Sequence, residues 1–92
     1  MNGVRYEDVK DRAGAIYDLV GTGVSLTLAQ VEELPVAHGR DGGAFRLEFT
    51  GPADPMLPQA IYAVASDGVE HDIFLVPIAR DQGETRYEAV FN

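Results

Sequence analysis

The chain has no cysteine and no long hydrophobic run. The missing cysteine excludes disulfides, thiolate zinc sites, iron–sulfur clusters and cysteine nucleophiles. No apolar stretch approaches the roughly 20 residues that a transmembrane helix needs. The first residues, Met1 to Asp8, are polar and acidic, unlike the basic start and apolar centre of a signal peptide. We therefore expect a cytoplasmic protein that is not held in a membrane.

Positive charge is scarce as well. Seven Lys and Arg residues stand against fifteen Asp and Glu residues, which gives a formal net charge of −8 at pH 7. Nucleic-acid-binding proteins need a basic surface to neutralise phosphates, and anionic membrane surfaces attract basic segments. We therefore expect neither a nucleic acid nor a membrane among the partners, and we attribute the acidity to solubility.

The length of 92 residues suits one domain with a single core. Short segments with apolar residues at every second position, separated by turn residues, predict a mainly β protein. The short turns favour a six-stranded meander that forms a small barrel or a two-layer roll, with a short N-terminal helix over one open end. Within this domain, 1–92, we expect a helix over residues 5–12 and strands over residues 15–20, 24–34, 44–50, 60–65, 69–79 and 85–91.

Local signals refine these elements. The apolar spacing also permits a single helix from Arg5 to Val20, but Gly14 would weaken its middle, so we favour a helix that stops near Gly14. A slip in the alternation near Gln30 predicts a β-bulge. Asp67-Gly68 is the strongest hairpin signal, because this pair suits turns with positive φ. Pro77 lacks an N–H and marks an edge position or a bulge.

The last two strands are expected to differ in their surroundings. Residues 73–76, Ile-Phe-Leu-Val, are apolar on both faces, which predicts a central strand with sheet or helix on either side. The final strand alternates and contains neither proline nor lysine, which commonly protect a sheet edge. We expect either closure within the monomer, which we favour, or addition of a partner strand at this edge. The residues of this possible interaction edge are Arg86, Tyr87, Glu88, Ala89, Val90 and Phe91.

A proline-rich segment over residues 51–58 separates two of the strands. Its prolines recur every third residue, as in polyproline II, and about seven such residues span roughly 20 Å. That length suffices to cross the end of a barrel, with Met56 and Leu57 filling the core. A docking ligand for an aromatic groove is the alternative. The residues of this signature loop are Gly51, Pro52, Asp54, Pro55, Leu57 and Pro58.

Histidine and serine are too few to offer many catalytic candidates. The serines are Ser25 and Ser66, and the histidines are His38 and His71. Ser66 and His71 lie near one hairpin end but on opposite strands, and no Gly-x-Ser-x-Gly elbow is present. We therefore predict no catalytic residue and no enzyme.

Metal and phosphate sites find equally little support. Alternation places Glu70 and Asp72 on one strand face and His71 on the other, so the three cannot converge on a metal. Glu70 and Asp72 could hold a cation weakly if Asp67 joined them. Residues 21–23, Gly-Thr-Gly, lead into a strand and lack the lysine of a phosphate loop. We therefore predict no metal site and no cofactor.

Four aromatic residues, Tyr62, Phe74, Tyr87 and Phe91, could line a ligand pocket. A barrel of six strands leaves little interior volume, so we expect these rings to fill the core instead. A small-ligand-binding β-barrel with a cavity near Tyr62 and Tyr87 is the alternative function.

The second half of the chain carries a distinctive pattern, made of residues 49–55, Leu57-Pro58-Gln59, Tyr62, Phe74-Leu75-Val76-Pro77 and 86–92. In this pattern the chain resembles a family of short bacterial proteins that form an uncharacterised conserved domain. The resemblance implies a bacterial protein, and its members often accompany phage-tail-collar or fibre-like proteins. We therefore expect a non-enzymatic interaction module, an accessory or chaperone of a bacterial or phage-like fibre assembly. Its partner would be a fibre or tail-like protein or a second copy of the chain; an enzyme active only within a complex is a further alternative.

Overall fold

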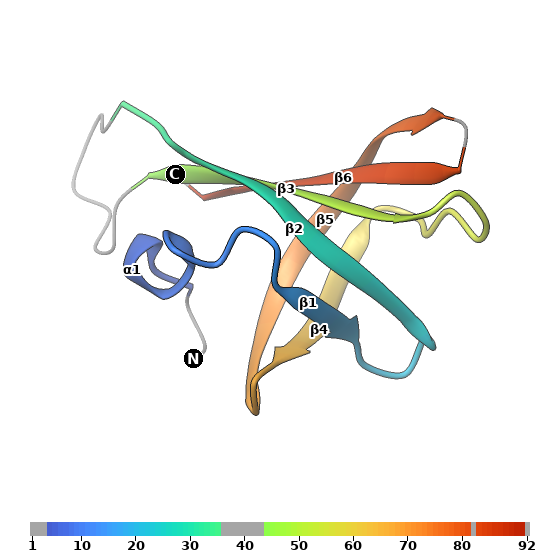
Figure 1. Ribbon diagram of the computed structural model, residues 1–92, viewed down its shortest axis with the longest axis horizontal. Coiled ribbons are helices and arrows are strands. Elements are labelled where there is room, and N and C mark those ends of the chain that lie inside the picture. Colours follow the sequence, from blue (N-terminus) through green and yellow to red (C-terminus); the bar gives the residue numbers. More distant parts are fainter. Residues whose placement is uncertain (1–3, 36–43, 82, 92) are drawn as a thin grey trace.

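The computed structural model describes residues 4–35, 44–81 and 83–91. Six antiparallel strands form a closed barrel (Figure 1), as predicted for a mainly β protein with one short helix. His38, one of the candidates from the sequence, lies outside the described residues. The elements are α1 (Tyr6–Val9), β1 (Ile16–Leu19), β2 (Val24–Glu33), β3 (Phe45–Pro52), β4 (Ala60–Ser66), β5 (Val69–Asp81) and β6 (Glu84–Phe91).

The strand order around the barrel is β1-β2-β3-β6-β5-β4. The chain therefore runs as two meanders of three strands, and the expected single meander is interrupted between β3 and β4. The proline-rich segment makes this connection, so it crosses from one side of the barrel to the other, as its extended length predicts.

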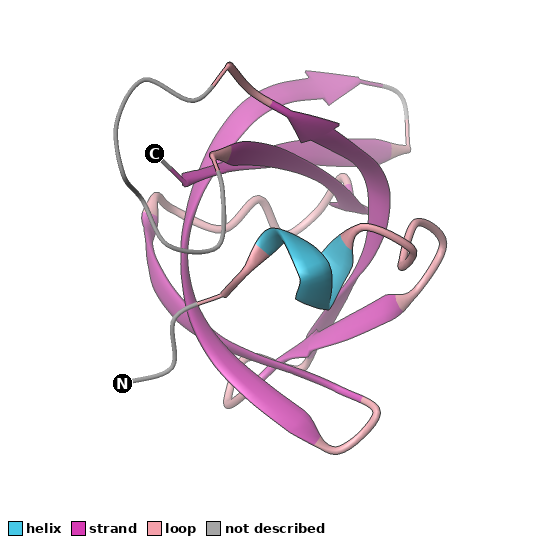
Figure 2. Ribbon diagram, turned by 90° about the vertical axis from the view of Figure 1, so that its left-hand side faces the viewer, coloured by secondary structure: helices cyan, strands magenta, loops and turns pink. Residues whose placement is uncertain are grey.

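Alternate side chains of the strands fill the interior. The pattern is clearest in β3, where Phe45, Leu47 and Phe49 are fully buried and the residues between them are partly exposed. Figure 2 shows α1 in front of one end of the barrel, and Val9 of this helix belongs to the same buried cluster. The ring of Tyr6 lies 5.9 Å from that of Phe45. The expected cover over one open end is therefore present.

The helix is shorter than the expected span of residues 5–12. The Arg12 N–H donates to the carbonyl of Val9 in a turn, and Gly14 adopts a φ of +96°. The Gly14 N–H then donates to the carbonyl of Leu28 at 2.7 Å, which ties the backbone to β2. The helix already ends at Val9, with Lys10 as its C-cap, so the expectation that Gly14 ends it is wrong. The positive φ of Gly14 instead turns the chain into β1.

The bulge predicted near Gln30 is present, and of the two possibilities for Pro77, an edge position or a bulge, the structure has the bulge. The register of β2 against β3 shifts between Leu28 and Gln30, and that of β5 against β6 shifts between Pro77 and Ala79. The predicted hairpin turn is confirmed as well, since Asp67 and Gly68 have φ values of +53° and +80°. Positive φ at both central residues is the geometry that suits Asp-Gly.

Gly68→Val is expected to lower the free energy of unfolding by about 1–3 kcal/mol, because valine is strained at positive φ. A side chain at this position would meet no atom within 4 Å, so backbone strain alone would cause the loss. Urea denaturation measures the effect, with Gly68→Asn as control because asparagine tolerates this conformation. Equal stability of Gly68→Val and wild type would contradict the assigned turn.

The expectation that residues 73–76 are covered on both faces is wrong. Ile73 and Leu75 point into the core, but Phe74 is 49% exposed on the outer surface. A small barrel has one interior, and no described element packs against the outside of β5 here. Buried and exposed residues therefore alternate along this apolar run, as in any strand with one buried face, and an aromatic side chain lies on its outer face.

Candidate functional site

Because the barrel is closed, part of the predicted interaction edge is paired with neighbouring strands on both sides. β6 pairs with β3 over residues 84–91 and with β5 over residues 84–88. Arg86, Tyr87 and Glu88 therefore lie between two strands, as the favoured closure within the monomer predicts, and their backbone offers no edge to a partner strand. Ala89 is buried in the core, whereas Val90 is outward and exposed. The ring of Phe91 stacks on Phe45 at 4.6 Å. A contact surface at these last three residues stays a prediction.

The signature loop is a crossover held by the core. Gly51 and Pro52 complete β3, and Asp54, Pro55 and Pro58 are exposed. Leu57 packs against the core and its N–H donates to the Tyr87 hydroxyl at 2.9 Å. A side chain at Gly51 would clash with Cδ2 of the buried Leu26, so a larger residue here would require the Leu26 side chain to shift within the core.

Two further details concern the end of the crossover. Met56 is largely exposed, so the expectation that it fills the core is wrong. The Tyr62 hydroxyl donates to the carbonyl of Pro58. Burial of this ring raises the pKa of Tyr62, so the phenol stays neutral and able to donate across the physiological range.

The catalytic and metal candidates do not converge. Glu70 and Asp72 lie exposed, while His71 is half-buried on the opposite face of the strand. No group of three potential metal ligands occurs in the part of the chain that the structure describes. Ser66 and His71 line one cavity, but the Ser66 hydroxyl donates to the carbonyl of Ile16 and accepts from Arg12. Ser66 is thus committed to structure, and no histidine-activated serine is formed.

Arg12, which no motif singled out, connects the helix region to the β4–β5 hairpin. Its guanidinium donates to the carboxylate of Asp67 at 2.7 Å, to the hydroxyl of Tyr17 at 3.0 Å and to the hydroxyl of Ser66. The hydrogen bond to Asp67 is the main cause that raises the pKa of Arg12 above its ordinary value. The guanidinium of Arg12 therefore remains charged across the physiological pH range.

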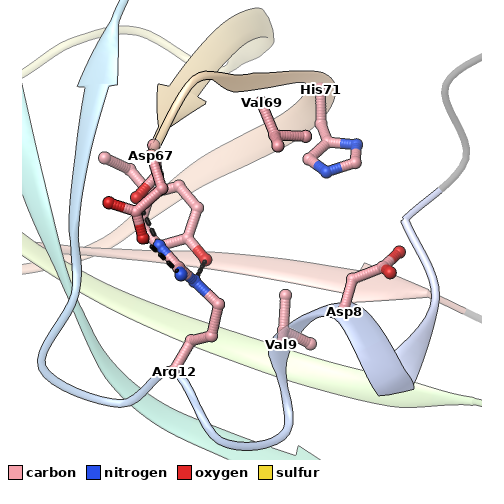
Figure 3. A pocket seen from close by; sticks show the side chains of 8 residues that line it. Asp8, Val9, Arg12, Asp67, Val69 and His71 are labelled. Carbon is pink, nitrogen blue, oxygen red and sulfur yellow. Dashed lines mark hydrogen bonds and ion pairs between the residues drawn. The ribbon is translucent and has the colours of Figure 1, made fainter.

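Beside this contact a cavity of about 180 Å³ opens between α1 and the hairpin (Figure 3). A second, shallower hollow lies on the other side of Arg12, along β1 and β4. Neither is lined by Tyr62 or Tyr87, where the sequence placed the alternative ligand pocket. The lining residues of the first cavity are Asp8, Val9, Arg12, Tyr17, Ser66, Asp67, Val69 and His71.

An apolar patch on the outer wall is formed by Val20, Ile61 and Phe74. Their side chains are 51%, 69% and 49% exposed. Ile61 of β4 lies directly opposite Phe74 of β5, and the Val20 N–H donates to the carbonyl of Ala63, two residues from Ile61. Large apolar side chains gathered on neighbouring strands and left in water mark a candidate interaction surface.

A charged network covers a different part of the wall. Arg46 of β3 forms ion pairs with Glu48 at 2.9 Å, with Glu32 at 3.7 Å and with Glu88. The hydrogen bond from Arg46 is the main cause that lowers the pKa of Glu48. Because these charges neutralise one another, this surface offers less to a ligand than the apolar patch does.

No helix in the described segments is long and apolar enough to cross a membrane. No curated protein and no solved structure matches the chain. The sequence does match a family of proteins that is described as a domain of unknown function, DUF6916, over residues 4–91. This match spans nearly the whole barrel, including both the apolar patch and the cavity, and confirms the expectation of an uncharacterised domain family. The chain therefore belongs to the DUF6916 family.

Proposed function

We propose that this protein is a non-enzymatic interaction module that binds another protein through the apolar patch. The observation that carries the proposal is the juxtaposition of Ile61 and Phe74, which are paired across β4 and β5 and exposed together. Aromatic and aliphatic side chains of this kind commonly form the centre of a protein interface.

The acidic side chains around the patch indicate what charge the partner's surface carries. Asp72 lies opposite Ala63 next to the patch, and Asp18 and Glu70 flank Ala65 in the following row. β1, β4 and residues 69–76 contain neither lysine nor arginine. The complementary surface is therefore apolar at its centre and basic at its border. A second copy of the chain would bring the same acidic side chains together, which disfavours self-association.

A fibre or tail-like bacterial protein is the partner class that the resemblance implies. An acidic-bordered apolar patch supports a role as accessory or chaperone of such an assembly, because it can cover a basic-bordered apolar surface of a subunit before that surface is buried in the assembly. Added salt screens the charge interactions at the border and so weakens this binding, whereas the apolar contacts at the centre remain.

Phe74→Lys is expected to weaken binding of the partner by about 100-fold, because it places a charge at the centre of the interface. The matched control is Met56→Lys, which adds the same charge at a position 46% exposed in the connection between β3 and β4, outside the patch. Affinity capture with wild type and both variants identifies proteins that are lost only with Phe74→Lys, and calorimetry with the purified partner then measures the affinities.

Binding that is kept by Met56→Lys and lost in Phe74→Lys supports the patch as the binding surface. Equal binding by the two variants would place the interface elsewhere and refute the proposal. Circular dichroism of both variants confirms that each is folded. The exposed position of Phe74 makes this the expected result.

A further inference from the structure

The first half of β5 is longer than the strand beside it. β4 pairs with β5 from Val69 to Leu75, whereas β6 pairs with β5 on the other side only from Val76 to Asp81. Figure 1 shows β5 and β6 diverging from the hairpin that joins them. Among the residues that the structure describes, the first half of β5 therefore has a paired strand on one side only.

The register shows which backbone groups face the open side. The Val20 N–H donates to the carbonyl of Ala63 at 2.9 Å, so Ala63 directs its backbone groups toward β1 and away from β5. In an antiparallel sheet the N–H and C=O of one residue lie on the same side, and the sides alternate along the strand. Asp72 lies opposite Ala63 and therefore directs both groups away from β4. The same holds for Glu70 and Phe74, two residues to either side.

We call the backbone of Glu70, Asp72 and Phe74 the β5 edge. Its N–H and C=O groups have no backbone partner within residues 4–35, 44–81 and 83–91. Natural edges are commonly protected by a lysine, a proline or a bulge. Residues 70–74 contain neither lysine nor proline, and the bulge of this strand lies further along, between Pro77 and Ala79. The β5 edge is therefore able to accept another strand.

The side chains beside the edge indicate what kind of strand fits. The side chains of Glu70 and Asp72 are exposed and form no ion pair with any described residue. Phe74, which follows on the same face, is half-exposed. Opposite charges across neighbouring strands stabilise a sheet, and like charges destabilise it. A complementary strand is therefore basic opposite the two carboxylates and apolar opposite the ring.

We propose that an extended segment of the partner protein adds to the β5 edge as an antiparallel strand. Every strand pair of the barrel is antiparallel, and this pairing is slightly more stable than the parallel one. Backbone hydrogen bonds supply affinity in such complexes, and side chains at alternate positions supply specificity. A second copy of the chain would bring the same carboxylates into one row, which disfavours it as the added strand. The inference rests on the proposed function, because Phe74 belongs to both the apolar patch and the edge.

Hydrogen exchange of the free protein tests whether the edge is open. The amides of Glu70, Asp72 and Phe74 are expected to exchange at least about 100-fold faster than those of His71 and Ile73, which face β4. These alternating amides control for one another, because all five lie in one strand. Equal protection of all five in the monomer would show that the edge is already covered and would overturn the proposal.

The peptide acetyl-Thr-Leu-Thr-Lys-Thr-Lys-Thr-amide serves as the probe. In an antiparallel pair its leucine lies opposite Phe74 and its lysines lie opposite Asp72 and Glu70. Titration of ¹⁵N-labelled protein is expected to show saturable shifts at these three amides, and their exchange is expected to slow. Replacing both lysines of the peptide by glutamate is expected to weaken binding at least about tenfold. Absence of saturable binding by the lysine peptide contradicts the proposal.

Backbone methylation distinguishes strand addition from attraction of charge alone. In the antiparallel pair the lysine N–H groups donate to the carbonyls of Asp72 and Glu70. Methylating these two peptide nitrogens keeps the charge but removes the donors, so binding is expected to weaken at least about tenfold. Methylating the nitrogens of the threonines that precede each lysine is expected to have little effect, because these groups point to solvent. Equal affinities of the two methylated peptides would reduce the contact to electrostatic attraction and refute an added strand.

A charge reversal locates the peptide on the protein. Asp72→Lys is expected to weaken the lysine peptide about tenfold and to strengthen the glutamate peptide. Glu33→Lys, the same change of charge at an exposed position of β2, is expected to leave both affinities unchanged. Unchanged binding of both peptides to Asp72→Lys would place them elsewhere and contradict the proposal.

The two proposals fail in different ways. Partner binding that Phe74→Lys abolishes, together with no strand addition by the peptide, refutes the added strand and leaves the apolar patch as the binding surface. Strand addition by the peptide, together with partner binding that Phe74→Lys does not weaken, refutes the patch as the binding surface.

Discussion

Phe49→Ala is expected to lower the free energy of unfolding by about 3–5 kcal/mol. Phe49 is completely buried in β3, and its ring meets that of Tyr17 edge-on at 5.5 Å. Its neighbours belong to strands that pair on both sides, so the wall cannot collapse easily into the space that the ring leaves. A domain of this size has about 5–15 kcal/mol of stability in total, so the variant is expected to lose a large fraction of it.

Thermal and urea denaturation measure this loss, and Phe74→Ala is the matched control. The same chemical change at a half-exposed position is expected to cost less than about 1 kcal/mol. The melting temperature of Phe49→Ala should fall by at least about 12 °C, a shift that Phe74→Ala does not share. Equal losses in the two variants would contradict their assignment to opposite faces of the barrel wall.

These two phenylalanines also show where sequence reasoning stops. Both lie in strands that alternation predicts, and Phe49 lies on the buried face of its strand. The face of Phe74 depends on whether another layer covers β5, and that is a property of the whole fold. In the sequence, the apolar run 73–76 looks like a central strand that is covered on both faces. In the structure the described part of the barrel has no second layer there, so one face of this strand is buried and the other is exposed to solvent.

Turns and bulges were predictable because a few neighbouring residues determine them. The pair Asp67-Gly68 by itself predicts a turn with positive φ values, and a slip in the alternation of apolar residues predicts the bulge at Gln30. Strand order is different. Nothing near Phe45 in the sequence indicates that it pairs with Phe91, because this pairing follows from the crossover and from closure of the whole barrel.

The cavity was hidden for a related reason. Arg12 looks like one more charge at the end of a helix, and its partners Ser66 and Asp67 are 54 and 55 residues away. His71 was considered for metal binding and catalysis together with its sequence neighbours. In the structure it lines one cavity together with Asp8 of α1 (Figure 3), a combination that no local pattern could reveal.

The acidic composition, attributed to solubility from the sequence, is partly organised in the structure. Glu32, Glu48 and Glu88 surround Arg46, whose side chain is four-fifths buried. The carboxylates come from β2, β3 and β6, so one guanidinium joins three neighbouring strands. Without it the same three charges would repel one another across the sheet.

Arg46→Met is therefore expected to lower the free energy of unfolding at pH 7 by about 1.5–3 kcal/mol. Methionine keeps much of the aliphatic packing, so the loss reports the charge and its hydrogen bonds. Arg80→Met is the matched control, because Arg80 is exposed on β5 and makes no ion pair within the described residues. Its expected effect is below about 0.5 kcal/mol.

The pH dependence of this loss has a definite sign. Arg46 holds the pKa of Glu48 in the folded protein below the ordinary value of 4.5. The stabilisation is therefore fully present above that value and is lost as the pH falls through the lower pKa of the folded state. Urea denaturation of wild type and Arg46→Met between pH 7 and pH 3 should show the two stabilities approaching each other as the glutamates become protonated. A gap that stays constant over this range would mean that Arg46 stabilises the barrel by packing and not through its carboxylate partners.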